Sequence, residues 1–189
     1  MRISTLPFLL TLSLFGIAWS ARAEQAPVPA EIAVCFVPGH PCESAIVAAI
    51  VAARHSIRVQ AYEFTAEPIL RALADARGRG VDVQVILDKR GDEERHGAHA
   101  VGSAFTVAAD IPTWIDSTVA IAHNKVIVID AVLVIGGSYN YTASAQRRNA
   151  ENVTFIRSAE VARQYLDNWT ERKARSHPSR FAVAKTAAR

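Results

Sequence analysis

Apolar and polar positions follow two rhythms along the first half of the chain. Short runs rich in β-branched residues, typical of strands, alternate with longer segments in which apolar residues recur every three or four positions, as on one face of a helix. This pattern predicts strands over residues 32–37, 57–64 and 81–88, and helices over 42–54 and 66–80. The order strand, helix, strand, helix, strand is typical of a layered α/β domain.

Strands follow one another without long helices between them from residue 111 onward. We expect a helix near the end of the charged segment 89–110, strands over 111–116, 125–130, 132–137 and 151–157, a short helix around 141–146 and a final helix over 158–175. The final helix is amphipathic, with its apolar side chains on one face. The sequence contains no internal repeat, so we expect one copy of any site.

The first 23 residues have the pattern of a secretory signal peptide: a basic start at Arg2, a short apolar run, and small residues at Ala21 and Ala23. The apolar run is too short, and too often interrupted, for a membrane-spanning helix. We predict that residues 1–23 are cleaved. The mature protein should then be periplasmic or secreted, without stable insertion into a membrane.

The rest of the chain has the length of one compact domain, which we predict over residues 24–175, followed by a basic C-terminal tail over 176–189. The formal charge is +3 for the whole chain and +1 without the signal, but six Lys or Arg and no acid follow Glu171. A basic tail on an acidic body could help to bring in a polyanion. A solvated, frayed terminus is the plainer alternative.

Cysteine and histidine pairs raise the question of a disulfide or a metal. Cys35 and Cys42 lie on either side of a Pro-Gly turn, and in an exported protein they could form a disulfide, although two free thiols remain the alternative. His96 and His99, with one of the glutamates before them, could bind a metal. Their spacing lacks a sharper ligand pattern, so we expect a solvated loop and no metal site.

The stretch AHNKVIVID, residues 122–130, places two costly polar side chains at the start of a predicted buried strand. Side chains alternate along a strand, so His123 and Lys125 project from the same face. The apolar residues of this strand cannot satisfy an imidazole or an ammonium, and a buried lysine without a partner is expensive. We therefore expect an anionic group, such as a phosphodiester, to meet this pair.

A hairpin should bring further polar groups to the same place. If residues 130–131 form its turn, the lysine lies opposite Gly136 and the histidine lies opposite Ser138. Glycines beside the lysine would leave room for a ligand. Ser138 and Asn140 would offer hydrogen-bond donors to phosphate oxygens.

Two acidic residues flank the hairpin. Seven residues of extended strand span about 20 Å, so Asp130 should lie far from His123, and we interpret it as a turn residue whose carboxylate binds backbone groups. Glu151, at the start of the next strand, could reach the imidazole. A carboxylate in that place fixes the tautomer and stabilises the charged ring, so Glu151 is the predicted partner of His123.

These residues together resemble a known family. HNKVIVID fits the HxKxxxxD motif of the phospholipase D superfamily, and GGSYNYTASAQRRNAENV is similar to the GSxN segment and the following glutamate that accompany this motif. Nearly all of the mature chain resembles the small secreted bacterial endonucleases of that superfamily, which carry one motif per chain. The motif alone occurs by chance, but in this combination it is highly specific.

The resemblance implies a fold and an activity. The fold is a single α/β/α sandwich around a mixed β-sheet, and the activity is that of a metal-independent phosphodiesterase without a cofactor, working through a covalent phosphohistidine. His123 matches the nucleophile, Glu151 its partner, and Asp130 the motif aspartate, which we keep as structural. The phosphate ligands of the family match Lys125, Ser138 and Asn140.

A single HxK motif has a consequence for the mechanism. Displacing an alcohol from a phosphodiester requires a nucleophile on one side and a proton donor on the other, and histidine can serve as either. A two-fold homodimer would supply the second His123. We expect DNA or RNA as the substrate. The alternatives are phospholipid headgroups, as for a phospholipase D, and a catalytically silent module that binds nucleic acid.

Four aromatic residues lie in segments near the predicted site. Tyr62, Phe64, Tyr139 and Tyr141 could stack on nucleic acid bases. Because Tyr62 and Phe64 end an apolar strand, we expect these two to pack in the core instead.

Overall fold

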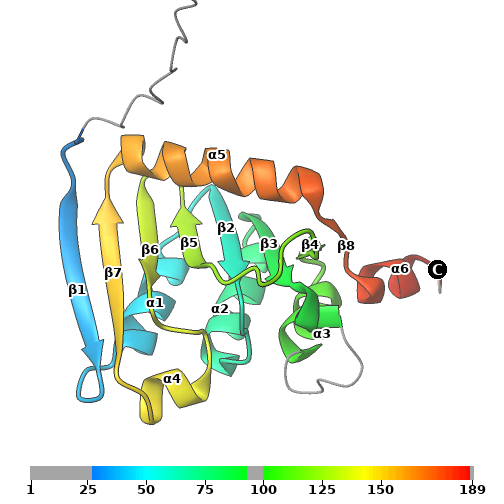
Figure 1. The fold of residues 1–189 in the computed structure, drawn as a ribbon, viewed down its shortest axis with the longest axis horizontal. Coiled ribbons are helices and arrows are strands. Elements are labelled where there is room, and N and C mark those ends of the chain that lie inside the picture. Colours follow the sequence, from blue (N-terminus) through cyan, green and yellow to red (C-terminus); the bar gives the residue numbers. More distant parts are fainter. Residues whose placement is uncertain (1–26, 93–99, 188–189) are drawn as a thin grey trace, which may run out of the picture.

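Eight strands form one mixed sheet in the computed structural model, within residues 27–92 and 100–187, which are the parts of the chain that the structure describes (Figure 1). The strands are β1 (Glu31–Val37), β2 (Ser56–Ala61), β3 (Asp82–Asp88), β4 (Thr113–Asp116), β5 (Lys125–Ile129), β6 (Leu133–Gly137), β7 (Glu151–Arg157) and β8 (His177–Pro178). The helices are α1 (Cys42–Val51), α2 (Glu67–Gly78), α3 (Ala100–Ala108), α4 (Ala143–Arg147), α5 (Ala159–Arg175) and α6 (Arg180–Ala187), with a 3-10 helix η1 (Lys89–Asp92) after β3.

The strand order is β1-β7-β6-β5-β2-β3-β4-β8. β2, β3 and β4 run parallel, with helical segments between them in the sequence. β5 and β6 pair antiparallel through a tight turn, and β6 and β7 pair antiparallel across a segment that contains α4. The change of rhythm that the sequence shows at residue 111 comes one strand before the change to antiparallel pairing, because β4 still pairs parallel with β3. The predicted α/β class and mixed sheet are confirmed.

Helices cover both faces of the sheet (Figure 1). Alternate residues of β5 point to opposite faces, so Ile127 packs with α1 and α2 in the larger core cluster, while Val128 packs with Ala162 of α5 in the smaller one. The edge strand β1 is less well covered, and Val34 and Phe36 stay more than half exposed. The result is the α/β/α sandwich that the family resemblance implies.

The hairpin between β5 and β6 differs from the prediction by one residue. Asp130 and Ala131 do form its turn, both with positive φ, and the N–H of Val132 donates to the carbonyl of Ile129. In the ladder, however, Ile129 is opposite Leu133, so Val132 is an extra residue that bulges between turn and strand. The predicted pairings of the lysine with Gly136 and of the histidine with Ser138 are therefore wrong.

The C-terminal residues pack against the domain. β8 is the edge strand and pairs antiparallel with β4. The Ser179 hydroxyl, fully buried, lies 2.7 Å from the Ser103 hydroxyl and 2.8 Å from a carboxylate oxygen of Asp92. The alternative of a frayed terminus is wrong for residues 177–187. Attraction of a polyanion by these basic residues stays a prediction.

Two predictions concern residues outside the described parts: the signal peptide over 1–23 and the metal alternative at His96 and His99. Within 27–92 and 100–187, no helix has the length and hydrophobicity that crossing a membrane requires. In the same ranges, no three His, Cys, Asp or Glu side chains gather where they could hold a metal ion.

Candidate active site

Strand ends carry His123, Lys125 and Glu151 to one edge of the sheet, the edge that is formed by these strand ends and at which α4 lies in Figure 1. Lys125 starts β5 and is paired with Ala61, the last residue of β2. β6 ends and β7 begins at the same edge, where Gly137 is opposite Val153. His123 precedes β5 by two residues and Glu151 starts β7, so the topology gathers segments that are far apart in the sequence.

The centre of the site is a contact between Lys125 and His123. The Lys125 Nζ atom lies 3.2 Å from the His123 Nε2 atom and donates to the His123 carbonyl oxygen at 2.9 Å. An ammonium group can only donate, so this arrangement uses Nε2 as an acceptor and requires a neutral imidazole. The histidine side chain is exposed, while only 8% of the lysine is. The imidazole is thus accessible and the ammonium is held in place.

Burial has an electrostatic cost at Lys125. Loss of water lowers the pKa of its ammonium, and the carboxylates of Glu151 and Glu63 raise it in part, so that the pKa stays below the ordinary value of 10.5. The nearby carboxylates therefore offset only part of the cost of burying this ammonium. Such a group favours the arrival of an anion.

Glu151 does not contact His123 within one subunit, contrary to the predicted pairing. Its carboxylate accepts from the Ser138 hydroxyl at 2.5 Å and from the Asn149 side-chain amide at 2.9 Å. The His123 ring lies instead against Tyr62, with 4.7 Å between ring centroids. Because the imidazole is turned toward the end of β2, the carboxylate at the start of β7 binds the nearer hydroxyl. A catalytic role of Glu151 stays a prediction.

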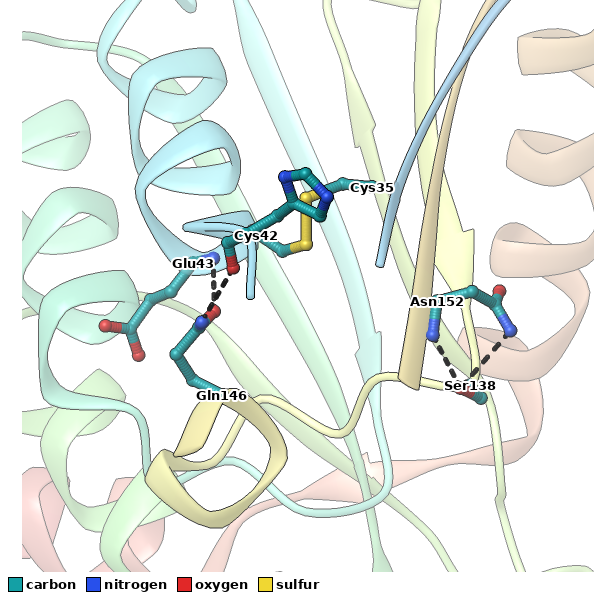
Figure 2. Close-up of a disulfide and its surroundings, with 7 residues drawn as sticks. Cys35, Cys42, Glu43, Ser138, Gln146 and Asn152 are labelled. Carbon is teal, nitrogen blue, oxygen red and sulfur yellow. Dashed lines mark hydrogen bonds between the residues drawn. A yellow bond between two sulfur atoms is a disulfide. The ribbon is translucent and has the colours of Figure 1, made fainter. Parts of the chain in front are cut away.

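The predicted phosphate ligands Ser138 and Asn140 lie at this edge and are held by other side chains. The Ser138 hydroxyl, which donates to the glutamate, accepts from the Asn152 backbone N–H at 3.1 Å (Figure 2). The Asn140 amide donates to Glu63 at 3.3 Å, and its Oδ1 atom is buried without a hydrogen-bond partner among the described residues. Their binding of phosphate stays a prediction.

The backbone conformation and a close contact explain the glycine at position 137, whereas the sequence explained it by room for a ligand. Its φ of 141° is rare for other residues, and a Cβ atom there would lie 2.3 Å from the Asn152 carbonyl oxygen. At Gly136, a Cβ atom would make only an ordinary contact, 3.7 Å from the Lys125 carbonyl oxygen. The second glycine therefore permits the close approach of β7.

A buried carboxylate holds the loop that carries His123. Asp88, at the end of β3 and 1% exposed, accepts from the backbone N–H of Ala122 at 2.7 Å and from that of Arg90 at 3.1 Å. Ala122 is the residue directly before the histidine. Asp88 therefore fixes the backbone from which the imidazole projects.

A second carboxylate holds the start of the same loop. Asp116, paired with Asp88 across β3 and β4, accepts from the Thr118 backbone and hydroxyl and, at 2.6 Å, from Nε of Arg172. Burial raises the pKa of Asp116, but the hydrogen bonds from Arg172 and Thr118 outweigh it, so the net shift is downward. The loop from β4 to β5 is thus anchored at both ends.

The aromatic residues are distributed differently from the prediction. Phe64 is buried, as expected, but so are Tyr139 and Tyr141, and burial raises the pKa of both phenols. Tyr62 is only half-buried, because β2 ends at Ala61 and its ring leaves the sheet beside His123. Tyr62 is therefore the aromatic residue that reaches the site.

A disulfide closes the loop at one side of the site (Figure 2). Cys35 and Cys42 are bonded, which is the first of the two predicted alternatives. Beside the bridge, the Gln146 side chain accepts from the Glu43 N–H and donates to the His40 carbonyl, each at 2.9 Å. These bonds tie the segment between β1 and α1 to α4.

Asp130 lies at the opposite edge, in the β5–β6 turn. Its carboxylate accepts from the backbone N–H groups of Arg54, His55 and Ser56 at 2.9, 2.7 and 2.9 Å. These bonds join the hairpin to the start of β2, which is the backbone binding that the sequence predicts. They lower the pKa of Asp130 from 3.8 despite its burial.

Sequence reasoning missed four residues at the site: Tyr62, Glu63, Asp88 and Arg90. A signal was present, because all four stand at or just after the ends of β2 and β3. Ligands of α/β proteins bind at the carboxyl ends of parallel strands. Placing this rule beside the HxK motif would have indicated them.

The carboxylates of Asp88 and Asp130 should respond differently to amide substitution. In Asp88→Asn the new NH2 group opposes a backbone N–H, so the His123 loop shifts, and we expect kcat for a phosphodiester to fall by about 100-fold with KM changed little. Asp130→Asn should lower the free energy of unfolding by about 1–3 kcal/mol, with kcat per folded molecule unchanged.

Steady-state kinetics beside chemical denaturation measure both effects. Because the pKa of Asp130 is lowered in the folded state, its stabilising contribution is present above pH 3.8 and is lost as the pH falls further. The two stability curves should therefore converge in acid. Normal kcat in Asp88→Asn, or a folded but inactive Asp130→Asn, would contradict this assignment.

Lys125→Met should separate activity from stability. We expect turnover to fall by at least about 1,000-fold, as a missing charge at a transition state allows, while the free energy of unfolding at pH 7 rises by about 1–2 kcal/mol because a desolvated charge is removed. The lysine has a lowered folded pKa, so its penalty is complete below that pKa and disappears as the pH rises past 10.5. Denaturation of both proteins between pH 7 and 10.5 tests this; a less stable Lys125→Met would refute it.

Comparison with known proteins places the site in a family. The family described as "Cardiolipin synthase, PLD-like domain" matches residues 46–172. A Rickettsia bellii protein named phospholipase D is 43% identical over 147 residues, covering 77% of this chain and 71% of its own. The human mitochondrial cardiolipin hydrolase is 28% identical over 160 residues, covering 84% of this chain and 62% of its own.

The fold has a solved counterpart. The phospholipase D family member Nuc of Salmonella typhimurium superposes with a TM-score of 0.75 and 35% identity, over 80% of this chain and 99% of Nuc. His123 and Lys125 lie within residues 46–172, which the family model matches. The chain therefore belongs to the phospholipase D superfamily, and it is a phosphodiesterase of that superfamily.

Proposed function

We propose that this protein is a nuclease that cleaves DNA or RNA through a covalent phosphohistidine, without a metal ion, as a homodimer. The observation that carries the proposal is the exposed His123 imidazole with Nε2 within 3.2 Å of a buried ammonium. A neutral nitrogen nucleophile beside a fixed cation is what attack on an anionic diester requires.

The surroundings of the pair support a polymeric substrate. A cavity beside the loop, lined by Asp116, Ala122 and Asn124, has a volume of only about 10 Å³. An apolar groove of about 800 Å³ lies by Asp130, at the opposite edge. A nucleic acid strand with accessible phosphates can reach the HxK pair at the open edge. The acyl chains of a lipid bound at that edge would not reach the apolar groove, because the groove lies at the opposite edge.

The proposed reaction has two balanced steps. The neutral imidazole of one His123 attacks phosphorus, the bond to the leaving alcohol breaks, and the second subunit's His123, as imidazolium, gives its proton to the leaving oxygen. Water then attacks phosphorus, its proton passes to the second imidazole, and the bond between nitrogen and phosphorus breaks. Lys125 from each subunit balances the charge on the phosphate oxygens.

A phospholipase D activity on lipid headgroups is the second candidate. The names of two relatives favour it: the phospholipase D of Rickettsia bellii and the human mitochondrial cardiolipin hydrolase. Both candidates use the same phosphodiester chemistry. The third alternative, a catalytically silent nucleic-acid-binding module, does not agree with a phosphodiesterase of this superfamily.

Substrate and metal dependence can be measured together. We expect the mature protein to nick plasmid DNA in excess EDTA, and His123→Ala to do so at least about 1,000-fold more slowly, because the covalent route is removed. Vesicles of phosphatidylcholine, and vesicles containing cardiolipin, serve as parallel substrates. Hydrolysis of vesicles alone would favour the phospholipase, and activity that EDTA abolishes and zinc restores would refute the metal-independent mechanism.

The dimer can be tested by mixing subunits. If each site needs both histidines, co-refolding with excess His123→Ala should lower activity per wild-type subunit in proportion to the wild-type fraction. Excess Asp130→Asn, which keeps its histidine, is the matched control and should not lower it. Sedimentation gives the mass. Constant activity per wild-type subunit, or an active monomer, would contradict the shared site.

A further inference from the structure

A second cation lies near the HxK pair and contacts the same tyrosine, Tyr62. Arg90, in η1, has its Cζ atom 5.4 Å from the Tyr62 ring centroid, and its Nη1 atom donates to the Tyr62 hydroxyl. The Lys125 Nζ atom is also 5.4 Å from that centroid. The two cations are thus separated by no more than twice that distance.

Arg90 is held in place from both ends. Its backbone N–H donates to Asp88, the carboxylate that also anchors the His123 loop. Its guanidinium donates to Tyr62, and in residues 27–92 and 100–187 no carboxylate forms an ion pair with it. A guanidinium has five N–H donors in a planar fork. The donors that Tyr62 does not use suit a second oxyanion.

From this arrangement we propose that Arg90 and Tyr62 form a subsite for a second phosphate, the neighbour along a nucleic acid strand of the phosphodiester at His123. This inference rests on the proposed nuclease function. Arginine binds phosphate through paired hydrogen bonds. Because the two cations lie within 5.4 Å of one ring centroid, two successive phosphates of one strand can contact both.

A structural role of Arg90 makes a different prediction. If the arginine only supports Tyr62, which supports the His123 ring, its loss would slow every phosphodiester equally. If it binds a neighbouring phosphate, its loss weakens only substrates that have one. A small diester with a single phosphate therefore separates the two roles.

The experiment compares three variants on three substrates: a single-stranded oligonucleotide, bis(p-nitrophenyl) phosphate and cardiolipin vesicles. Arg90→Ala should raise KM for a single-stranded oligonucleotide by roughly tenfold. The slope of log KM against log salt concentration should fall by about one, because one phosphate contact is lost. The same substitution should leave kcat/KM for bis(p-nitrophenyl) phosphate unchanged. Arg90→Lys, which keeps a point charge, should lie between wild type and Arg90→Ala. Arg163→Ala, an exposed arginine on α5, is the matched control and should change the kinetics on none of the substrates.

Each other outcome overturns the subsite. An equal loss on the oligonucleotide and the small diester, in variants with normal thermal melting, would make Arg90 a positioning residue for Tyr62, and no loss on either would remove it from the site. A loss on cardiolipin vesicles without one on the oligonucleotide would assign the second phosphate to a lipid. Wild-type protein that does not cleave the oligonucleotide refutes the proposed function itself, whereas an active wild type with a normal Arg90→Ala refutes the subsite alone.

Discussion

The contact between the Lys125 ammonium and His123 is the interaction on which the site depends. It exists because β5 is inserted antiparallel between β2 and β6, which places its first residue at the edge where the parallel strands end. The lysine is nearly buried and its pKa is lowered, so the fold tolerates an incompletely compensated charge there. The ammonium lies 3.2 Å from the His123 Nε2 atom, in a position suited to an anion.

Carboxylates organise this edge without occupying its centre. Asp88 and Asp116 accept backbone N–H groups of the loop before β5, so a flexible connection becomes a defined support for His123. Glu63 and Glu151 accept from the amide and the hydroxyl of the two predicted phosphate ligands. A bound phosphate would compete with these acceptors, because amide and hydroxyl donors bind either kind of oxyanion.

The open position of the site agrees with the chemistry that the superfamily shares. An accessible imidazole with two cations near Tyr62 suits the binding of phosphate esters, and it does not by itself choose between nucleic acid and lipid. The choice depends on what lies next to the scissile group. Arg90 is the proposed second anion site, whereas the apolar groove lies at the far edge by Asp130.

The sequence by itself determined the elements, the fold class and the motif pair. Apolar periodicity is a local property, so strands and helices could be placed to within a few residues, and alternation put His123 and Lys125 on one face. It also placed Asp130 far from the histidine, because the length of a strand is known from its residue count. The motif combination identified the family for the same reason, since spacing along one hairpin is local.

Only the tertiary structure decided which groups meet. The bulge at Val132 changed the hairpin register by one residue, a choice that depends on turn geometry and on the packing of both faces. The partner of His123 proved to be Tyr62 rather than Glu151, and Asp88 entered the site from a strand 34 residues away. Such contacts join segments distant in the chain, and their geometry follows from strand order and strand ends, which no local pattern encodes.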